Sequence, residues 1–323
     1  PEDEPILGSA LGKGMEKRIL AGYEYLITNY KPNDNIYIFG FSRGAHQARA
    51  LAGLIAYTGI PDLSEQISSD MQISTNRIIE LVKKKSDKDY IEQWKAWSPG
   101  QPPALAEVID KKLGYEVRPA EITFLGVWDT VPGSSLKNYG ACKEQKGIFK
   151  KYLFWMIPGV DKGERYKSDS YPPIKKIVHV MSVDEKRSKF RPIQICDPIS
   201  PAYTDVEEVW FPGAHADVGG GYKNQFELPN LSLGWMIKIF AENYRFKGTV
   251  PKITGNPRGL AHWSIGDAPA NIGSVCEDRV IPADATIHES VDERKNAGKV
   301  SIRIEENNVK MIKDLDYPIN CPE

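Results

Sequence analysis

The segment Gly40-Phe41-Ser42-Arg43-Gly44 has the residue types and spacing of a nucleophile elbow. In an elbow, a sharp turn between a strand and a helix exposes a serine hydroxyl, and the flanking glycines leave room where backbone segments crowd. A β-rich run over residues 35–39 precedes the motif, and an Ala/Leu-rich helical pattern over 45–57 follows it. The expected helix start also aims unsatisfied N–H groups at the site, which suits a developing oxyanion. We therefore predict that Ser42 is a nucleophile rather than a surface serine that caps a helix.

A serine nucleophile needs a base that removes its proton, and histidine is the usual choice. His215 follows an expected strand and opens a glycine-rich loop, the kind of segment that carries catalytic residues. His179 lies in an apolar run, which is typical of a core histidine. His46 is too constrained by the helix after Ser42 to act as the base, and it is expected on the helix surface or in a pocket wall. His262 lies in polar sequence, where most histidines are solvated, and the same holds for His288. We predict His215 as the base.

The acid that orients the base is expected at the end of a strand, where a parallel sheet presents its functional groups. Asp129 directly follows the apolar run 122–128 and fits this position, although an aspartate there is also a common turn residue. Asp217 is a rival, but its place two residues from His215 disfavours the geometry that the pair needs. The spacing of these residues does not demand a metal, and we predict neither metal nor cofactor.

Helical and strand patterns alternate along the chain, which favours an α/β fold with a mainly parallel sheet flanked by helices. Strands are predicted at 35–39, 122–128 and 206–211, with 177–183 as strand or buried helix. Helices are predicted at 14–30, 45–57, 74–97 and 231–240.

We expect one α/β-hydrolase-like catalytic core over residues 1–245, with 135–172 as a lid or insertion. From about residue 246 to residue 323, Gly, Pro, Asp and Asn become frequent and periodicity fades. This stretch is expected to be an irregular extension packed on the core.

The composition is that of an ordinary globular protein of 323 residues, with a formal net charge of -1. A near-neutral balance argues against a dedicated nucleic-acid binder, which normally carries a strongly basic face. The four cysteines show no metal-ligand spacing, and they could form disulfides or remain free thiols. No apolar run approaches the roughly 20 residues that span a bilayer, so we predict no transmembrane segment.

The segment 147–158 combines aromatic, aliphatic and lysine residues. It is too short to span a bilayer, but its composition suits a lid or an interface-binding segment. Phe149, Phe154 and Trp155 are the predicted membrane contacts. A buried helix between core elements is an equal alternative.

Charge substitutions at these positions, Phe154→Asp and Trp155→Asp, are expected to weaken liposome binding and leave hydrolysis of a soluble ester intact. The reason is that only the contact with the lipid surface is lost. Vesicle cosedimentation and a soluble-ester assay measure the two properties separately. If both fall together, the segment belongs to the core.

Several motifs occur together and in order: GFSRGAHQARALAGLI, ITFLGVWDTV, HVMSVDEKRSKFRP, VWFPGAHADVGGGY and LSLGWMI. Over roughly residues 10 to 240 the chain resembles the uncharacterised α/β-hydrolase family that includes bacterial type VI secretion phospholipase effectors of the first lipase class. The resemblance implies Ser42 as nucleophile, Asp129 as orienting acid and His215 as general base. It also implies the backbone N–H of Arg43 as one oxyanion donor.

The resemblance further implies an antibacterial enzyme that cleaves acyl esters of membrane phospholipids, in the manner of a phospholipase A. Such a protein would come from a bacterium and act in the periplasm of a target cell, with secretion-apparatus and immunity proteins as partners. Two alternatives stay open: a carboxylesterase acting on a small soluble ester, and a non-catalytic hydrolase-like binding module. The presence of Ser, Asp and His together argues against the second.

One departure from the family pattern concerns the first strand. Family members begin with a strand that ends in an Asp-Gly-Thr-type segment, which is expected to supply the second oxyanion donor, and nothing in this sequence matches it. Losing one such donor typically costs about 10²–10³ in rate. We therefore expect this strand to lie upstream of Pro1.

Overall fold

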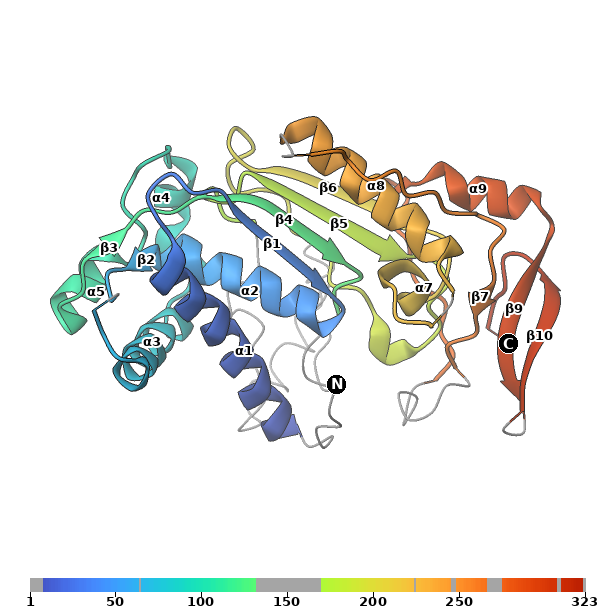
Figure 1. The fold of residues 1–323 in the computed structure, drawn as a ribbon, viewed down its shortest axis with the longest axis horizontal. Coiled ribbons are helices and arrows are strands. Elements are labelled where there is room, and N and C mark those ends of the chain that lie inside the picture. Colours follow the sequence, from blue (N-terminus) through green and yellow to red (C-terminus); the bar gives the residue numbers. More distant parts are fainter. Residues whose placement is uncertain are drawn as a thin grey trace. The chain divides into compact units, whose positions relative to one another are not determined.

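The computed structural model describes residues 8–63, 65–131, 170–223, 225–244, 248–265, 275–306 and 309–321. A five-stranded sheet with the strand order β1-β4-β5-β6-β8 forms the centre of the fold. Its strands are β1 (Ile36–Phe41), β4 (Ile122–Trp128), β5 (Lys176–Ser182), β6 (Asp205–Phe211) and β8 (Thr286–Ile287). This parallel sheet flanked by helices confirms the predicted α/β class (Figure 1).

The apolar composition of the inner strands follows from burial on both faces. Nearly every residue of β4 is buried, and so is nearly every residue of β5. Parallel strands covered on both faces are typically continuous apolar runs rather than alternating ones. The segment 177–183, predicted as strand or buried helix, is therefore a strand.

Contacts within the chain divide it into two compact units. The first unit comprises Pro1–Val127, Pro132–Ile177 and Ile193–Glu207, and the second comprises Trp128–Val131, Val178–Pro192 and Glu208–Glu323. The predicted boundary near residue 245 stays a prediction.

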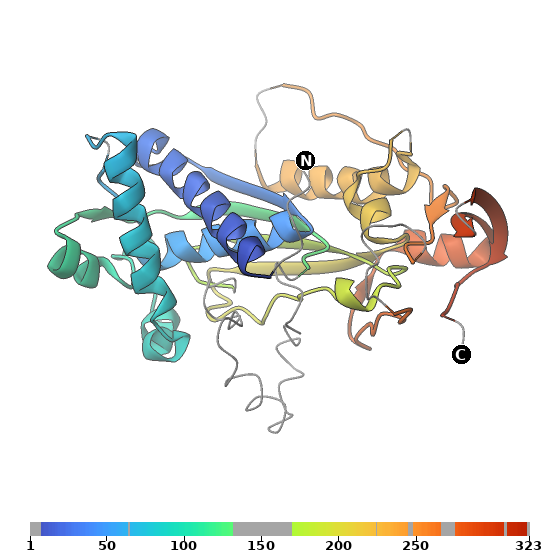
Figure 2. The same cartoon turned by 90° about the horizontal axis from the view of Figure 1, so that it is seen from below.

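In the first unit, three helices pack against one another: α1 (Gly8–Asn29), α2 (Arg43–Thr58) and α3 (Ser68–Lys83). Figure 2 shows α1, in dark blue, crossing over α2. Half of the buried residues of α2 are alanines or glycine, which allow the close approach of its neighbours. The predicted helix over 74–97 is interrupted after α3. The other elements described in this unit outside the central sheet are β2 (Ile60–Pro61), a 3₁₀ turn (Asp87–Tyr90), α4 (Ile91–Lys95), α5 (Ala106–Leu113) and β3 (Val117–Arg118).

The second unit contains most of the stretch that was expected to be irregular. Its helices are α7 (His215–Gly219), α8 (Glu227–Asn243) and α9 (Glu289–Asn296), and its small sheet has the order β10-β9-β7, formed by β10 (Val309–Asp316), β9 (Lys299–Glu306) and β7 (Ala261–His262).

The expectation of an irregular C-terminal stretch is wrong for the β9–β10 hairpin. Val300, Ile302 and Ile304 alternate with polar residues and are buried together with Leu228 and Ala261. Strict alternation is typical of a strand with one buried face, and this signal was present in the sequence.

None of the helices in the ranges listed above is long and apolar enough to cross a bilayer.

Candidate active site

Ser42 is the single residue between strand β1 and helix α2, so the predicted strand–turn–helix context is present. Its backbone angles are φ 61° and ψ -126°. A positive φ is unusual for a residue with a side chain and marks a strained position, of the kind that clusters at active sites. The Ser42 side chain makes no capping hydrogen bond to the described backbone of helix α2. This geometry therefore does not support the alternative in which Ser42 caps the helix.

The first backbone amides of α2 differ in whether the helix supplies them with an acceptor. Ala45 N and His46 N both donate to the carbonyl oxygen of Ser42, at 3.1 and 3.4 Å. Arg43 is the first residue of the helix, and the first amides of a helix have no acceptor within it. The Arg43 N–H, the predicted oxyanion donor, occupies such a position.

The two glycines of the motif differ in what surrounds them. A Cβ atom added at Gly40 would lie 2.5 Å from the carbonyl oxygen of Gly44 and 2.8 Å from the Cα atom of Ala45. A Cβ atom added at Gly44 would meet no described atom within 4 Å. The structure confirms the predicted crowding at Gly40. For Gly44 the prediction of crowding is wrong among the described residues.

Replacing Gly40 by alanine is expected to cost about 1–3 kcal/mol of stability, because backbone atoms must move to admit the methyl group. Gly44→Ala is the matched control, and it is expected to leave the fold intact because a helical Gly→Ala change is favourable in open space. Thermal unfolding followed by circular dichroism compares the two variants. Equal stability of both variants would contradict the close packing of this turn.

Asp129 and His215 form a direct pair in the second unit. Asp129 follows β4 immediately, has a φ of 41° and is fully buried. His215 is the first residue of α7, and its Nδ1 lies 2.6 Å from Asp129 Oδ2. The amide of Ser182, at the end of β5, donates to Asp129 Oδ1 at 3.0 Å. The two residues predicted as acid and base are thus brought together. Ser42 belongs to the first unit.

The Asp129 carboxylate also accepts two hydrogen bonds from Arg279, at 2.6 Å to Oδ1 and 2.8 Å to Oδ2. Burial alone would raise the pKa of Asp129. The positive charge of Arg279 and the hydrogen bonds from His215 and Arg279 outweigh burial and hold the pKa well below its usual range. Asp129 is therefore a carboxylate at neutral pH, as an orienting acid must be.

The His215 backbone and ring have further contacts within the unit. Glu185 Oε2 accepts from the His215 amide at 3.2 Å, and Oε1 of the same residue accepts from Ser264 at 2.7 Å. Arg187 pairs with Glu185 through two side-chain hydrogen bonds. The Phe190 ring meets the His215 imidazole edge-on, with centroids 5.0 Å apart. These contacts hold the first turn of α7, and with it the imidazole.

Both ring nitrogens of His179 are engaged elsewhere. Nε2 faces the amide of Thr130 at 3.1 Å, and Nδ1 lies 2.8 Å from Glu208 Oε1. This arrangement agrees with the predicted core histidine. His46 is fully buried, so the suggestion of helix surface is wrong. Burial and the nearby Arg49 lower the pKa of His46 to about 3, and the ring is neutral at physiological pH.

Asp217, the rival acid, supports a different histidine. Its Oδ1 lies 2.7 Å from His262 Nδ1, and its Oδ2 accepts from the amides of His262 and Ala214. His262 is only 5% exposed and stacks on Tyr222, so the prediction of a solvated side chain is wrong. Nothing in the local sequence marked this burial.

The prediction of a solvated side chain is also wrong in part for His288. Its ring stacks on Phe211, and its Nδ1 accepts from the amide of Ser290 at the start of α9. It is a helix-capping residue.

Two contributors to the site were not identified from the sequence as site residues, Glu185 and Arg279. Glu185 lies within the HVMSVDEKRSKFRP motif, which was noted as a whole. Arg279 lies in a loop without periodicity, 150 residues from Asp129, and gave no local signal.

The predicted membrane contacts, Phe149, Phe154 and Trp155, lie outside the described residues. Among the residues that are described, no three His, Cys, Asp or Glu side chains gather as a metal would require.

Comparison with known proteins gives one family match. The family described as T6SS, Phospholipase effector Tle1-like, catalytic domain matches residues 3–239. The uncharacterized protein YEL023C of Saccharomyces cerevisiae (strain ATCC 204508 / S288c) is 29% identical over 201 residues, which are 59% of this chain and 23% of the yeast protein.

Two solved structures are similar to part of the chain. The Tle1 effector bound to the VgrG spike from the Type 6 secretion system is 26% identical, with a TM-score of 0.28, over 67% of this chain and 31% of that one. An uncharacterized protein from Pseudomonas aeruginosa is 21% identical, with a TM-score of 0.30, over 73% of this chain and 27% of that one. The chain therefore spans less than a third of the length of each of these relatives.

Proposed function

Because this chain belongs to the Tle1-like family of type VI secretion phospholipase effectors, we propose that it is a serine hydrolase that cleaves acyl esters of membrane phospholipids. Ser42 is the nucleophile, His215 the general base and Asp129 the orienting acid. The observation that best supports the proposal is the buried Asp129–His215 pair, in which the carboxylate faces Nδ1 at 2.6 Å. That contact fixes the tautomer in which Nε2 can take a proton from a hydroxyl.

The order of the elements supports the same assignment. Ser42 follows β1, Asp129 follows β4, and His215 comes four residues after the end of β6. Open parallel sheets bind and transform ligands beyond the carboxyl ends of their strands. The chain order Ser, Asp, His is also the one typical of α/β-hydrolases.

The reaction follows from these groups. His215 removes the proton of Ser42 as the serine oxygen attacks the ester carbonyl, and the imidazolium then protonates the departing lysophospholipid alcohol. The Arg43 N–H donates to the oxyanion of the tetrahedral intermediate. Water, deprotonated by His215, hydrolyses the acyl-enzyme and releases a fatty acid. Asp129 keeps the imidazole in position throughout and stabilises its positive charge.

Product analysis tests the proposed bond specificity. With vesicles of phosphatidylethanolamine and phosphatidylglycerol, the full-length protein is expected to release fatty acid and lysophospholipid in equal amounts. Release of diacylglycerol or phosphatidic acid would contradict acyl-ester cleavage. A rate that rises when the substrate passes from monomers to vesicles supports a phospholipase, whereas a preference for monomeric short-chain esters supports a carboxylesterase.

We also propose that the full-length protein is delivered by a type VI secretion apparatus into the periplasm of a target cell. The support is the family, and one solved relative is described as bound to a VgrG spike. Copurification of the full-length protein with a spike protein from the same gene neighbourhood tests the first partner. An immunity protein is the second proposed partner, and growth of cells that express the enzyme in the periplasm, with and without the neighbouring gene, tests it.

A further inference from the structure

The Arg279 guanidinium is buried against the Asp129 carboxylate and is hydrogen-bonded on both of its terminal nitrogens. Its side chain is only 3% exposed. NH1 donates to Asp129 Oδ1 at 2.6 Å and to the carbonyl oxygen of Ser182 at 2.7 Å. NH2 donates to Asp129 Oδ2 at 2.8 Å and to the carbonyl oxygen of Phe190 at 2.6 Å. One planar group thus joins the carboxylate to the end of β5 and to the short 3₁₀ helix Ser188–Phe190, whose Phe190 ring contacts His215.

We propose that Arg279 is a positioning residue for catalysis, which fixes the plane and charge of the Asp129 carboxylate so that His215 is held in its reactive orientation. This inference rests on the proposed function of the Ser42–Asp129–His215 set. A bidentate guanidinium restrains a carboxylate in two directions at once, which a single hydrogen bond cannot do. Arg279 contacts neither the nucleophile nor the reacting ester in this proposal.

The hydrogen-bond inventory of Asp129 explains why the arginine matters. Oδ1 accepts from Ser182 N and from Arg279, and Oδ2 accepts from His215 and from Arg279. Without Arg279, the donors that remain to this buried carboxylate among the described residues are Ser182 N and His215, and rotation about its terminal bond becomes easier. Rotation of the carboxylate moves the acceptor that orients the imidazole.

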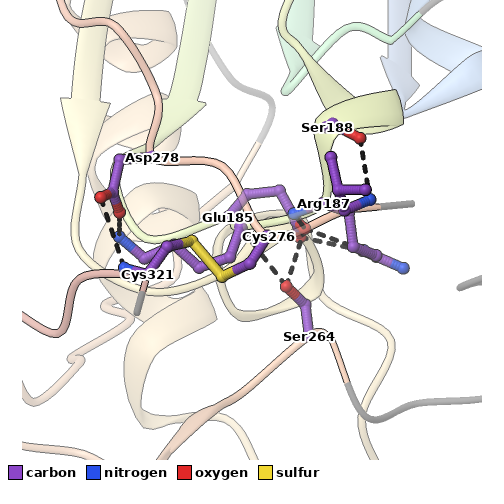
Figure 3. Close-up of a disulfide and its surroundings, with 9 residues drawn as sticks. Glu185, Arg187, Ser188, Ser264, Cys276, Asp278 and Cys321 are labelled. Atoms are coloured by element: carbon purple, nitrogen blue, oxygen red, sulfur yellow. Dashed lines mark hydrogen bonds and ion pairs between the residues drawn. A yellow bond between two sulfur atoms is a disulfide. The ribbon is translucent and has the colours of Figure 1, made fainter. Parts of the chain in front are cut away.

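The loop that carries Arg279 is also fixed by contacts that do not involve Asp129, among them the Cys276–Cys321 disulfide drawn in Figure 3. Cys276 forms a disulfide with Cys321, and the backbone of Cys276 pairs with that of Arg187. Lys186 Nζ contacts Asp278 Oδ1 at 2.5 Å, and Cys321 N donates to the other oxygen of that carboxylate. Arg279 thus lies three residues after a disulfide-bonded cysteine, and the disulfide restrains the segment that carries the guanidinium.

The test compares Arg279→Gln with wild-type full-length protein in hydrolysis of p-nitrophenyl butyrate across pH. We expect kcat to fall about 10²-fold, because a misplaced catalytic group costs that much. Arg279 helps to hold the pKa of Asp129 below its usual range, so the variant has a higher Asp129 pKa. Removing the guanidinium charge also favours a proton on the coupled Asp129–His215 pair, so the activity of the variant should fall away on the acid side at a higher pH than in wild type.

Arg294→Gln is the matched control. Arg294 is a fully buried arginine of the same unit, and it donates to the carbonyl oxygens of Pro257 and Gly259 rather than to the site. This variant should lose thermal stability and keep the wild-type pH profile. If Arg279→Gln behaves like Arg294→Gln, with lost stability and an unmoved pH profile, Arg279 is structural only and the proposal is overturned.

Two further variants keep the test decisive if Arg279→Gln does not fold. Arg279→Lys keeps the positive charge but cannot donate to both Asp129 oxygens in the geometry of a guanidinium. It should lose activity on the acid side at the same pH as wild type, and its kcat should be reduced. Replacing both Cys276 and Cys321 by serine should lower kcat and move the acid limb in the same direction as Arg279→Gln, by less. Wild-type kcat in both variants would overturn the proposal. Absence of fluorophosphonate labelling in wild type would instead remove the proposed function itself, and this inference with it.

Discussion

Replacing Ser42 by alanine in the full-length protein is expected to lower kcat for ester substrates by about 10⁶. The hydroxyl is the only protein group in the proposal that forms a bond to the acyl carbon, and neither His215 nor the Arg43 N–H can replace it. The strained backbone of Ser42, with φ 61°, is set by the turn and helix around it, so the variant should keep the wild-type fold. Initial rates with a soluble ester and with phospholipid vesicles measure the loss.

Ser69→Ala serves as the control for this substitution, because Ser69 is an exposed serine at the start of α3. It should retain wild-type activity and stability. Full activity in Ser42→Ala, in a preparation free of other esterases, would remove the serine-hydrolase proposal altogether.

Replacing Asp129 by asparagine is expected to lower kcat by about 10⁴, the magnitude seen when the equivalent acid of a serine protease is changed in this way. In this protein the amide has an additional conflict. Both carboxylate oxygens accept from two donors each, and Arg279 is one of the two in both cases. The asparagine NH₂ group must therefore face Arg279 in either orientation, together with Ser182 N or His215. A buried donor without an acceptor also costs stability, by about 1–3 kcal/mol.

Asp217→Asn tests the alternative in which Asp217, and not Asp129, is the orienting acid. Asp217 pairs with His262 and holds the amide of Ala214, so its loss should reduce stability and affect kcat far less than the loss of Asp129. Steady-state kinetics on both variants, with thermal unfolding as a check on folding, gives the comparison. If Asp217→Asn costs as much in kcat as Asp129→Asn while remaining folded, Asp129 is not the orienting acid.

The elbow and the central strands could be predicted because their signals are local. A glycine-flanked serine between a β-rich run and an alanine-rich helix leaves few alternatives, and β4 was predicted with the bounds that the structure has, Ile122–Trp128. The strand β5 has the same apolar composition but remained ambiguous, since periodicity alone does not separate a short buried strand from a buried helix.

The surroundings of Asp129 could not be predicted, because they depend on contacts far apart in the sequence. Arg279 reaches Asp129 across 150 residues from a loop with no regular pattern. The burial of His262 likewise depends on its pairing with Asp217, 45 residues away, and on the ring of Tyr222. The β9–β10 hairpin differs from these cases, because its alternating pattern was visible and was outweighed by the polar composition of the C-terminal region.

The most direct test of the central claim is to identify the residue that a fluorophosphonate probe modifies in the full-length protein. Peptide mass spectrometry should find one adduct, on the peptide that contains Ser42. Labelling should be absent in Ser42→Ala, slowed in Asp129→Asn and unchanged in Ser69→Ala. An adduct on another serine, or no adduct on a folded protein, would contradict the proposal that Ser42 is the nucleophile of a serine hydrolase.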